Sequence, residues 1–268
     1  MERLCLGILA DGDDAQESDN AMEAILKAYG LYKFYRIGGE DVAVLRDVSF
    51  TVGKGRFVAI MGPSGSGKST LLHIVSGLDR PTSGSVELAG RSLFDLSERE
   101  RTLLRRKLVG FVFQFYNLVP HLTVAENIGL PLMLAGVDDA RRSKRFSEVV
   151  GFFELERKLG QRPHQLSGGE MQRTSIARAL VAQPEIVLAD EPTGNISTKA
   201  GAEVMKLLRS SCDDLGQTIL LVTHNAKDAA WADEVHFLKD GEIARDVSLR
   251  DGDVNEARVF DCLAQLDI

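Results

Sequence analysis

The segment 62–69 restricts the fold of this chain more than any other part of the sequence. It reads Gly-Pro-Ser-Gly-Ser-Gly-Lys-Ser and matches the phosphate-loop pattern G-x-x-x-x-G-K-[ST] in full. Apolar residues 57–61 precede it and predict a buried strand, and residues 70–76 after it predict a helix. A glycine-rich loop without a ligand is the alternative, but this strand–loop–helix context favours a phosphate site in an α/β fold.

Each part of this motif has a predicted role. Its glycines allow successive backbone N–H groups to point at phosphates, and the following helix N-terminus adds a favourable dipole. Lys68 is expected to reach the β- and γ-phosphates, and Ser69 to bind Mg²⁺. The residues expected to contact ATP here are Gly62, Pro63, Ser64, Gly65, Ser66, Gly67, Lys68, Ser69 and Thr70.

Two acidic residues follow a second apolar run. Residues 186–189 are Ile-Val-Leu-Ala, and Asp190 and Glu191 come directly after them. Side chains at the carboxyl ends of parallel strands meet at one edge of the sheet, so these two are expected beside the phosphate loop. Taken alone, the pair could be a helix cap. With the phosphate loop in the same chain, Asp190 is predicted to hold Mg²⁺ and Glu191 to act as general base.

Charge and composition narrow the class of protein. The net charge is -7, but residues 1–25 carry -6 and residues 240–268 carry -5, so the body between them is mildly basic. No run approaches the roughly 20 apolar residues of a membrane span. The three cysteines, Cys5, Cys212 and Cys262, lack metal-ligand spacing and fit reduced thiols in a cytosolic protein. No basic arm indicates a nucleic-acid partner.

The order of elements predicts a domain organisation. Residues 1–24 are expected to form an acidic tail without a fold, 25–245 an ATPase domain and 246–268 a C-terminal extension. Runs at 42–45 and 48–52 predict strands of an antiparallel layer, while the alternation of helices and apolar strands after Lys68 predicts a parallel sheet. A mainly helical insertion is expected at about 115–180. Ser97 with Glu100 and Thr123 with Glu126 have the capping-box spacing of helix starts, and Asp240-Gly241 predicts a hairpin turn. In the extension, Phe260, Leu263 and Leu266 have the spacing of an amphipathic helix.

The motif at residues 166–173, Leu-Ser-Gly-Gly-Glu-Met-Gln-Arg, indicates which kind of nucleoside triphosphatase this is. It resembles the signature motif of ABC transporter ATPases. Ser167 with Glu170 has capping-box spacing, and Gly168 and Gly169 leave their N–H groups open to an anion. A helix cap without a ligand is the alternative. The resemblance implies that residues 167–169, called here the signature segment, contact the γ-phosphate of ATP bound to the other subunit.

Other elements of that family stand in order along residues 25–245. Tyr35 occupies the position where the family stacks an aromatic ring on adenine, although a lone tyrosine can equally be a core residue. Gln114 follows the strand expected at 109–113 and resembles the glutamine that senses Mg²⁺. His224 follows the strand expected at 218–222 and resembles the switch histidine that contacts the γ-phosphate. The resemblance therefore makes Glu191, His224, Gln114 and Lys68 the catalytic candidates, and Ser69, Gln114 and Asp190 the metal ligands.

The resemblance also implies a fold, an activity and partners. The fold is a P-loop nucleoside triphosphatase core with a parallel sheet, an antiparallel β-subdomain and a helical insertion. The activity is hydrolysis of Mg-ATP by a dimer that drives a separate polytopic membrane permease. The chain would then lie at the cytoplasmic face of the inner membrane as a peripheral subunit. A soluble ABC-type ATPase acting on DNA or ribosomes, and a regulatory module that binds ATP without turnover, are the two alternatives.

Three motifs resemble one branch of the family. Segments 77–84, 112–120 and 189–195 are similar to the ATPases that partner lipoprotein-releasing, macrolide-exporting and antimicrobial-peptide-resistance permeases. That branch implies export or extraction of a lipophilic or peptide substrate. The apolar run Phe115, Tyr116, Leu118, Val119 and Leu122 either packs inside the helical insertion or receives a permease helix.

The sequence departs from the family after the general base. The family usually has Asn-Leu-Asp before the next helix, and residues 195–197 here are Asn-Ile-Ser. Ser197 can cap that helix as well as an aspartate, but it brings no negative charge to a dimer interface. We therefore expect weak coupling between the two ATP sites of a dimer.

Overall fold

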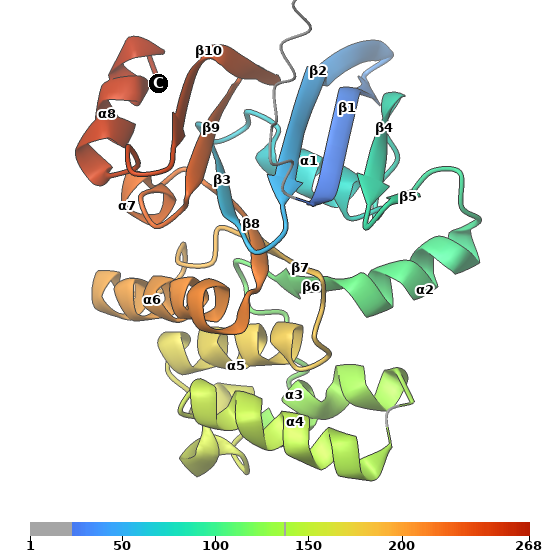
Figure 1. Cartoon of the computed structure of the whole chain (residues 1–268), viewed down its shortest axis with the longest axis vertical. Coiled ribbons are helices and arrows are strands. Elements are labelled where there is room, and N and C mark those ends of the chain that lie inside the picture. The colour runs from blue at the N-terminus through green and yellow to red at the C-terminus, as the bar shows by residue number, and fades with distance from the viewer. Residues whose placement is uncertain (1–22, 137) are drawn as a thin grey trace, which may run out of the picture.

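The structure is a computed structural model that describes residues 23–136 and 138–268 (Figure 1). Two sheets and a set of helices make up this part of the chain. The tail expected at residues 1–24 lies almost wholly outside the described residues, as does Cys5. Among the helices that the structure describes, none has the length and the apolar run that crossing a bilayer requires.

The larger sheet carries the predicted phosphate loop. Its six strands lie in the order β10-β9-β3-β8-β7-β6, and every pair except β9–β10 is parallel. Burial on both faces explains why β3 and β8 are apolar almost throughout rather than alternating. The strands are β3 (Phe57–Met61), β6 (Val109–Val112), β7 (Ile186–Asp190), β8 (Thr218–Thr223), β9 (Glu234–Lys239) and β10 (Glu242–Arg250).

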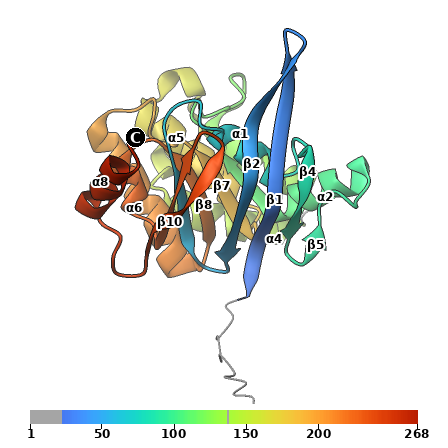
Figure 2. The same cartoon turned by 90° about the horizontal axis from the view of Figure 1, so that it is seen from above.

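The smaller sheet is the expected antiparallel layer, with the order β2-β1-β4-β5. The two short strands predicted at 42–45 and 48–52 are wrong as separate elements, because β2 runs unbroken from Glu40–Gly53. Its ladder with β1 (Ala24–Ile37) contains bulges that absorb the irregular pattern. The β1–β2 hairpin projects from the body of the molecule (Figure 2). The two remaining strands are β4 (Ser83–Leu88) and β5 (Arg91–Ser92).

Helix starts follow the capping signals in the sequence. The capping boxes predicted at Ser97 and Thr123 are confirmed, and each places a hydroxyl on the N–H group of the glutamate three residues on. The helices are α1 (Lys68–Val75), α2 (Glu98–Leu108), α3 (Val124–Leu134), α4 (Asp139–Phe152), α5 (Gly168–Leu180), α6 (Thr198–Leu215), α7 (Ala226–Ala229) and α8 (Glu256–Gln265). Two short 3₁₀ turns, η1 (Glu156–Lys158) and η2 (Pro163–Gln165), precede α5.

The helices between β6 and β7 lie together at one end of the molecule, where α3, α4 and α5 pack on one another (Figure 1). Before α3, residues 115–122 form a loop rather than a helix. The buried side chain of Asn127 holds this loop, because its amide accepts from Val119 N (2.8 Å) and donates to the carbonyls of Val119 and Leu122 (both 3.2 Å). The side chain of Asn127 therefore fixes the loop to α3.

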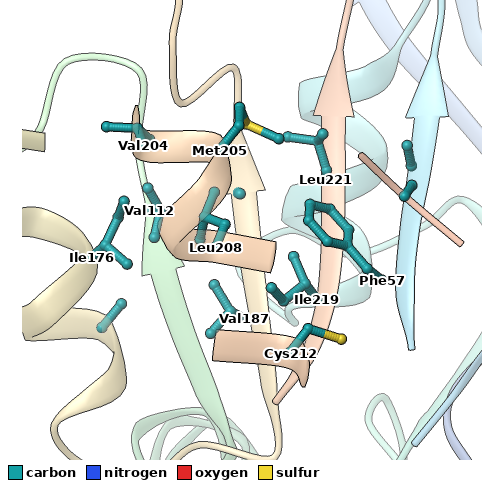
Figure 3. Close-up of a cluster of buried hydrophobic side chains, with 14 of the residues drawn as sticks. Phe57, Val112, Ile176, Val187, Val204, Met205, Leu208, Cys212, Ile219 and Leu221 are labelled. Carbon is teal, nitrogen blue, oxygen red and sulfur yellow. The ribbon is translucent and has the colours of Figure 1, made fainter. Parts of the chain in front are cut away.

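Strand β3 packs on both of its faces, and its alternation separates the two cores. Phe57, Ala59 and Met61 belong to the core shared with α5 and α6, while Val58 and Ile60 belong to the core shared with α1 and the antiparallel sheet. Figure 3 shows Met205 and Leu208 of α6 against Ile219 and Leu221 of β8 in the first of these cores. The phosphate loop is thus attached to a strand that is buried along its whole length.

The C-terminal helix α8 is amphipathic, but its buried face differs from the predicted one. Val259 is 0% exposed and Leu263 is 9% exposed, and both join the core. Phe260, which the spacing placed in the apolar stripe, is 52% exposed. The prediction for Phe260 is wrong because α8 packs on α7 and β10 through residues four apart, and Phe260 lies off that line.

This packing gives a paired test of α8. Leu263→Ala should lower the free energy of unfolding by about 2–4 kcal/mol, because it leaves a cavity in the core. Phe260→Ala should change it by no more than about 0.5 kcal/mol, since the ring contacts mainly water. Urea unfolding of the two variants measures both values. Equal losses would show that α8 does not pack as described.

Candidate active site

The phosphate loop lies so close to neighbouring backbone that two of its positions, Gly62 and Gly67, have no room for a side chain. A Cβ on Gly62 would lie 2.1 Å from the carbonyl oxygen of Leu238 at the end of β9. Gly67 has φ of 106° and a Cβ there would lie 2.7 Å from the carbonyl oxygen of Val44. These glycines allow the backbone to press against β9 and β2. The loop leads directly into α1, which begins at Lys68.

Two polar side chains of this loop are buried where a bound anion would suit them. Lys68 is 5% exposed, and its ammonium donates to the carbonyls of Gly62 (2.9 Å) and Pro63 (2.8 Å). Burial lowers the pKa of Lys68 below its ordinary value, although Glu191 and Asp190 oppose this effect. The hydroxyl of Ser66 is buried and has no partner. A bound phosphate would compensate both groups, so these residues fit the predicted ligand.

Asp190 and Ser69 meet at the edge of the sheet, as the sequence predicts. The hydroxyl of Ser69 donates to Asp190 Oδ1 at 3.2 Å. Burial is the main reason that the pKa of Asp190 is raised. The carboxylate of Asp190 and the hydroxyl of Ser69 are both oxygen ligands of the kind that Mg²⁺ prefers, and they could hold it together with phosphate oxygens. Within the described residues, no cluster of three Asp, Glu, His or Cys side chains could hold a metal by itself.

Glu191 connects the phosphate loop to the switch position. Its Oε1 lies 3.0 Å from Nδ1 of His224, which follows β8, and 3.9 Å from the ammonium of Lys68. The backbone of Glu191 has φ of 43°, a left-handed conformation that costs a non-glycine residue about 1 kcal/mol. Bonds from Glu191 N to Val222 O and from Gly194 N to Glu191 O, both 3.0 Å, hold it there. The carboxylate is thereby fixed at the mouth of the loop.

Gln114 lies on the neighbouring strand end. Strand β6 pairs in parallel with β7, with Val112 opposite Ala189, so the residue two positions on lies beside the Asp190–Glu191 corner. A Cβ on Gly194 would be 2.8 Å from Nε2 of Gln114. Asn195 Nδ2 also donates to the carbonyl of Gln114 at 2.9 Å. Gln114 is therefore positioned by the loop that follows Glu191.

Tyr35 lies near the loop with one side of its ring accessible. It is 38% exposed, and its hydroxyl donates to Asp79 Oδ2 at 2.7 Å. The ammonium of Lys33 lies 4.7 Å from the ring centroid and donates to Asp79 Oδ1 at 2.8 Å. Burial, followed by the bond to Asp79, raises the pKa of the Tyr35 hydroxyl. The ring is thus a fixed and partly open surface on which a base could stack.

The signature segment lies apart from this cluster. Ser167 caps α5 with the predicted box: its hydroxyl accepts from Glu170 N (3.4 Å), and Glu170 Oε2 accepts from Ser167 N (2.8 Å). The segment lines a hollow of about 480 Å³ with residues 195–197 and the start of α6, and no phosphate-loop residue lines that hollow. One copy of the chain thus holds two half-sites that do not meet.

Comparison with known proteins identifies the family. Residues 45–194, more than half of the chain, match the family model for the ABC transporter. The chain belongs to the ABC transporter ATP-binding family. It is accordingly an ATPase, and its fold is the P-loop cassette that the sequence predicts.

Relatives match almost all of the described chain. The lipoprotein-releasing system ATP-binding protein LolD of Geobacter metallireducens is 43% identical over 225 residues, which are 84% of this chain and 100% of that protein. The macrolide export ATP-binding/permease protein MacB of Photorhabdus laumondii is also 43% identical over 225 residues, but these are 35% of its length. The match to MacB therefore covers only about a third of that protein.

Solved structures show the same cassette as a dimer. The dimeric structure of MJ0796, a protein of Methanocaldococcus jannaschii, superimposes with a TM-score of 0.77 at 42% identity, covering 84% of this chain and 98% of that chain. A second dimeric structure of MJ0796, in a post-hydrolysis state with ADP and Pi, gives 0.76 at 41% identity, with the same coverage. Nucleotide binding by this ABC cassette follows from the family.

The structure also shows contacts that the sequence alone did not reveal. Asp228 of α7 is buried with a raised pKa and accepts a short hydrogen bond from Thr193, so it ties the loop after Glu191 to the helix after His224. Lys158 of η1 forms an ion pair with Glu170 at 2.8 Å. Thr193 and Glu170 lie in family motifs, but nothing local in the sequence marks Asp228 as the partner of Thr193 or Lys158 as the partner of Glu170.

The geometry of Tyr35 leads to a paired test of base stacking. Tyr35→Ala should weaken ATP binding about tenfold or more, because alanine removes the ring. Tyr35→Phe should bind ATP nearly as well as the wild type, since it keeps the ring and loses only the hydroxyl group, which bonds Asp79. Isothermal titration of ATP at one salt concentration compares the three proteins. If Tyr35→Ala binds normally, the ring has a structural role only.

Proposed function

We propose that this chain is the ATP-hydrolysing subunit of a transporter that exports or extracts a lipophilic or peptide substrate. Two copies would close on two Mg-ATP molecules, each between the phosphate loop of one copy and the signature segment of the other. The observation that carries this proposal is the separation of the two half-sites in one copy, each built for an anion but neither complete. An antiparallel pair of copies completes both.

Roles in hydrolysis follow from the contacts around Glu191. Its carboxylate would accept a proton from the attacking water, and the contact with His224 Nδ1 holds that carboxylate in place. Burial lowers the pKa of Lys68, and the negative charge of a γ-phosphate would stabilise its ammonium form. Mg²⁺, held by Ser69, Asp190 and Gln114, would supply charge neutralisation on the phosphates. The other loop residues from Ser64 to Thr70 would supply backbone N–H groups, whereas Pro63 has none to offer.

The transporter branch is supported by the relatives. LolD and MacB are named for lipoprotein release and macrolide export. A substrate of that kind requires a membrane permease, and a chain of this family would then be a peripheral subunit at the cytoplasmic face of the membrane. We further propose that residues 25–245 are the ATPase domain, with the helical insertion at about 115–180 between the ATP site and the permease.

A groove beside the insertion is our proposed docking site for the permease. It has a volume of about 470 Å³, and the residues that line it include Phe111, Phe113 and Leu130. Phe115 does not line the groove but lies two residues beyond Phe113, and it is 70% exposed. Tyr116 is different, because its hydroxyl donates to Asn195 O at 3.0 Å and so it packs inward. Within the apolar run, Phe115 is therefore more exposed than Val119, at 37%, while Tyr116 turns inward, and Phe115 is the residue that we propose to contact a permease helix.

The general base is tested by Glu191→Gln. Glutamine keeps the shape of the side chain but cannot accept the proton of water, so hydrolysis should fall by about 100-fold or more. ATP should still bind, and the trapped nucleotide should convert monomer to dimer. Phosphate release and size exclusion with ATP measure the two effects. Undiminished turnover in this variant would assign the base elsewhere.

The docking site is tested by Phe115→Glu. A charge there should abolish co-purification with the permease, because it would have to be buried in an apolar contact. Basal hydrolysis and melting temperature should be unchanged, since the ring contacts mainly water in the free subunit. Leu215→Glu is the matched control, because Leu215 is 48% exposed at the end of α6. Loss of the permease in both variants, or in neither, would contradict the proposal.

A further inference from the structure

The carboxylate of Glu170 shares a hydrogen bond with the hydroxyl that is proposed to face the γ-phosphate. Ser167 Oγ donates to Glu170 Oε2 at 2.8 Å, and the N–H group of Ser167 donates to the same oxygen at 2.8 Å. A serine hydroxyl has one hydrogen. In the free chain that hydrogen is therefore held by a carboxylate rather than by a phosphate.

This arrangement places the negative charge of Glu170 next to the proposed position of the γ-phosphate. Two acceptors around one hydroxyl lie within about 5 Å of each other, given ordinary hydrogen-bond lengths. Two anions at that distance repel, and a carboxylate also offsets part of the positive potential at the N-terminus of α5. An uncompensated Glu170 would weaken the very contact that the signature segment is proposed to make.

Lys158 lies against the other oxygen of this carboxylate. Its ammonium is 2.8 Å from Glu170 Oε1, and the two side chains are 32% and 17% exposed. The bond to Lys158 is the main reason that the pKa of Glu170 falls to about 2, so the carboxylate is charged at neutral pH and the pair has no net charge.

The lysine comes from a segment that is itself fixed. The residues just after η1 accept backbone bonds from the start of α3, through Ala125 N to Leu159 O (3.1 Å) and Val124 N to Gln161 O (2.8 Å). The N-terminal residues of α3 therefore hold the segment that carries Lys158 beside α5. Asn127 of the same helix holds the loop that contains Phe115. The backbone next to Lys158 is therefore held in place beside α3.

We propose that Lys158 is a positioning residue of the signature segment: it neutralises Glu170 and holds its carboxylate so that Ser167 can turn its hydrogen to the ATP of the partner subunit. This inference rests on the proposed ATP-sandwich dimer. It assigns a role in phosphate recognition to a residue that need not touch the nucleotide. The expected consequence is electrostatic, because removal of Lys158 leaves one extra negative charge at each ATP.

The test uses the full chain in the Glu191→Gln background and measures ATP-driven dimerisation by size exclusion. Lys158→Ala should raise the ATP concentration needed for half-dimerisation by about fivefold, the scale of one partly exposed charge pair, at low salt. The effect should shrink above about 0.5 M salt, where such charges are screened. Lys144→Ala is the control, since Lys144 is an exposed lysine of α4 in the same group of helices.

The decisive variant is the double substitution Lys158→Ala with Glu170→Gln. Glutamine can still complete the capping box but has no charge, so dimerisation should return to the level of the parent. If Lys158→Ala has no effect, or if Glu170→Gln does not restore it, the inference is wrong and the lysine is only structural. If the Glu191→Gln parent stays monomeric with ATP, the proposed dimer itself fails, and the role of Lys158 fails with it.

Discussion

The arrangement of this molecule depends on the close approach of the phosphate loop to backbone on either side of it. Gly62 lies against the end of β9, and Gly67 lies against β2 of the other sheet. The N–H group of Gly62 donates to Thr223 O (3.3 Å) and that of Ser66 to Pro63 O (3.2 Å), and both bonds help to fix the loop in this position. The buried Lys68 and the unpaired Ser66 hydroxyl then point to an anion as the missing partner.

Parallel pairing gathers the chemistry at one edge of the sheet. Strands β6, β7, β3 and β8 lie side by side, so Gln114, Asp190, the phosphate loop and His224 all follow strand ends that face the same way. Hydrogen bonds between the connecting loops then set the fine geometry. Asn195 holds the carbonyl of Gln114, and Thr193 binds Asp228, so the segment after Glu191 connects three of these strand ends.

The helices between β6 and β7 give the fold its second half-site. Ser167 at the start of α5 is displaced from the phosphate loop of the same chain, and it shares its hollow with residues 195–197 instead. Ser197 caps α6 there, with its hydroxyl accepting from Ala200 N at 3.4 Å, so the departure from the family leaves the helix start intact. Its effect on coupling between two ATP sites stays a prediction. Under the proposed function such an ATPase needs a second copy, and a permease docked on the helical insertion would influence closure.

The sequence by itself determined the elements whose signals are local. The phosphate loop, the capping boxes at Ser97, Thr123 and Ser167, and the Asp240–Gly241 turn were all readable, because each depends on residues within a few positions. Only the tertiary structure decided that Phe260 faces water, that Tyr116 turns inward while Phe115 does not, and that Lys158 meets Glu170. Those outcomes depend on which element, distant in the sequence, packs against each residue. The periodicity of one segment does not show which other segment will pack against it.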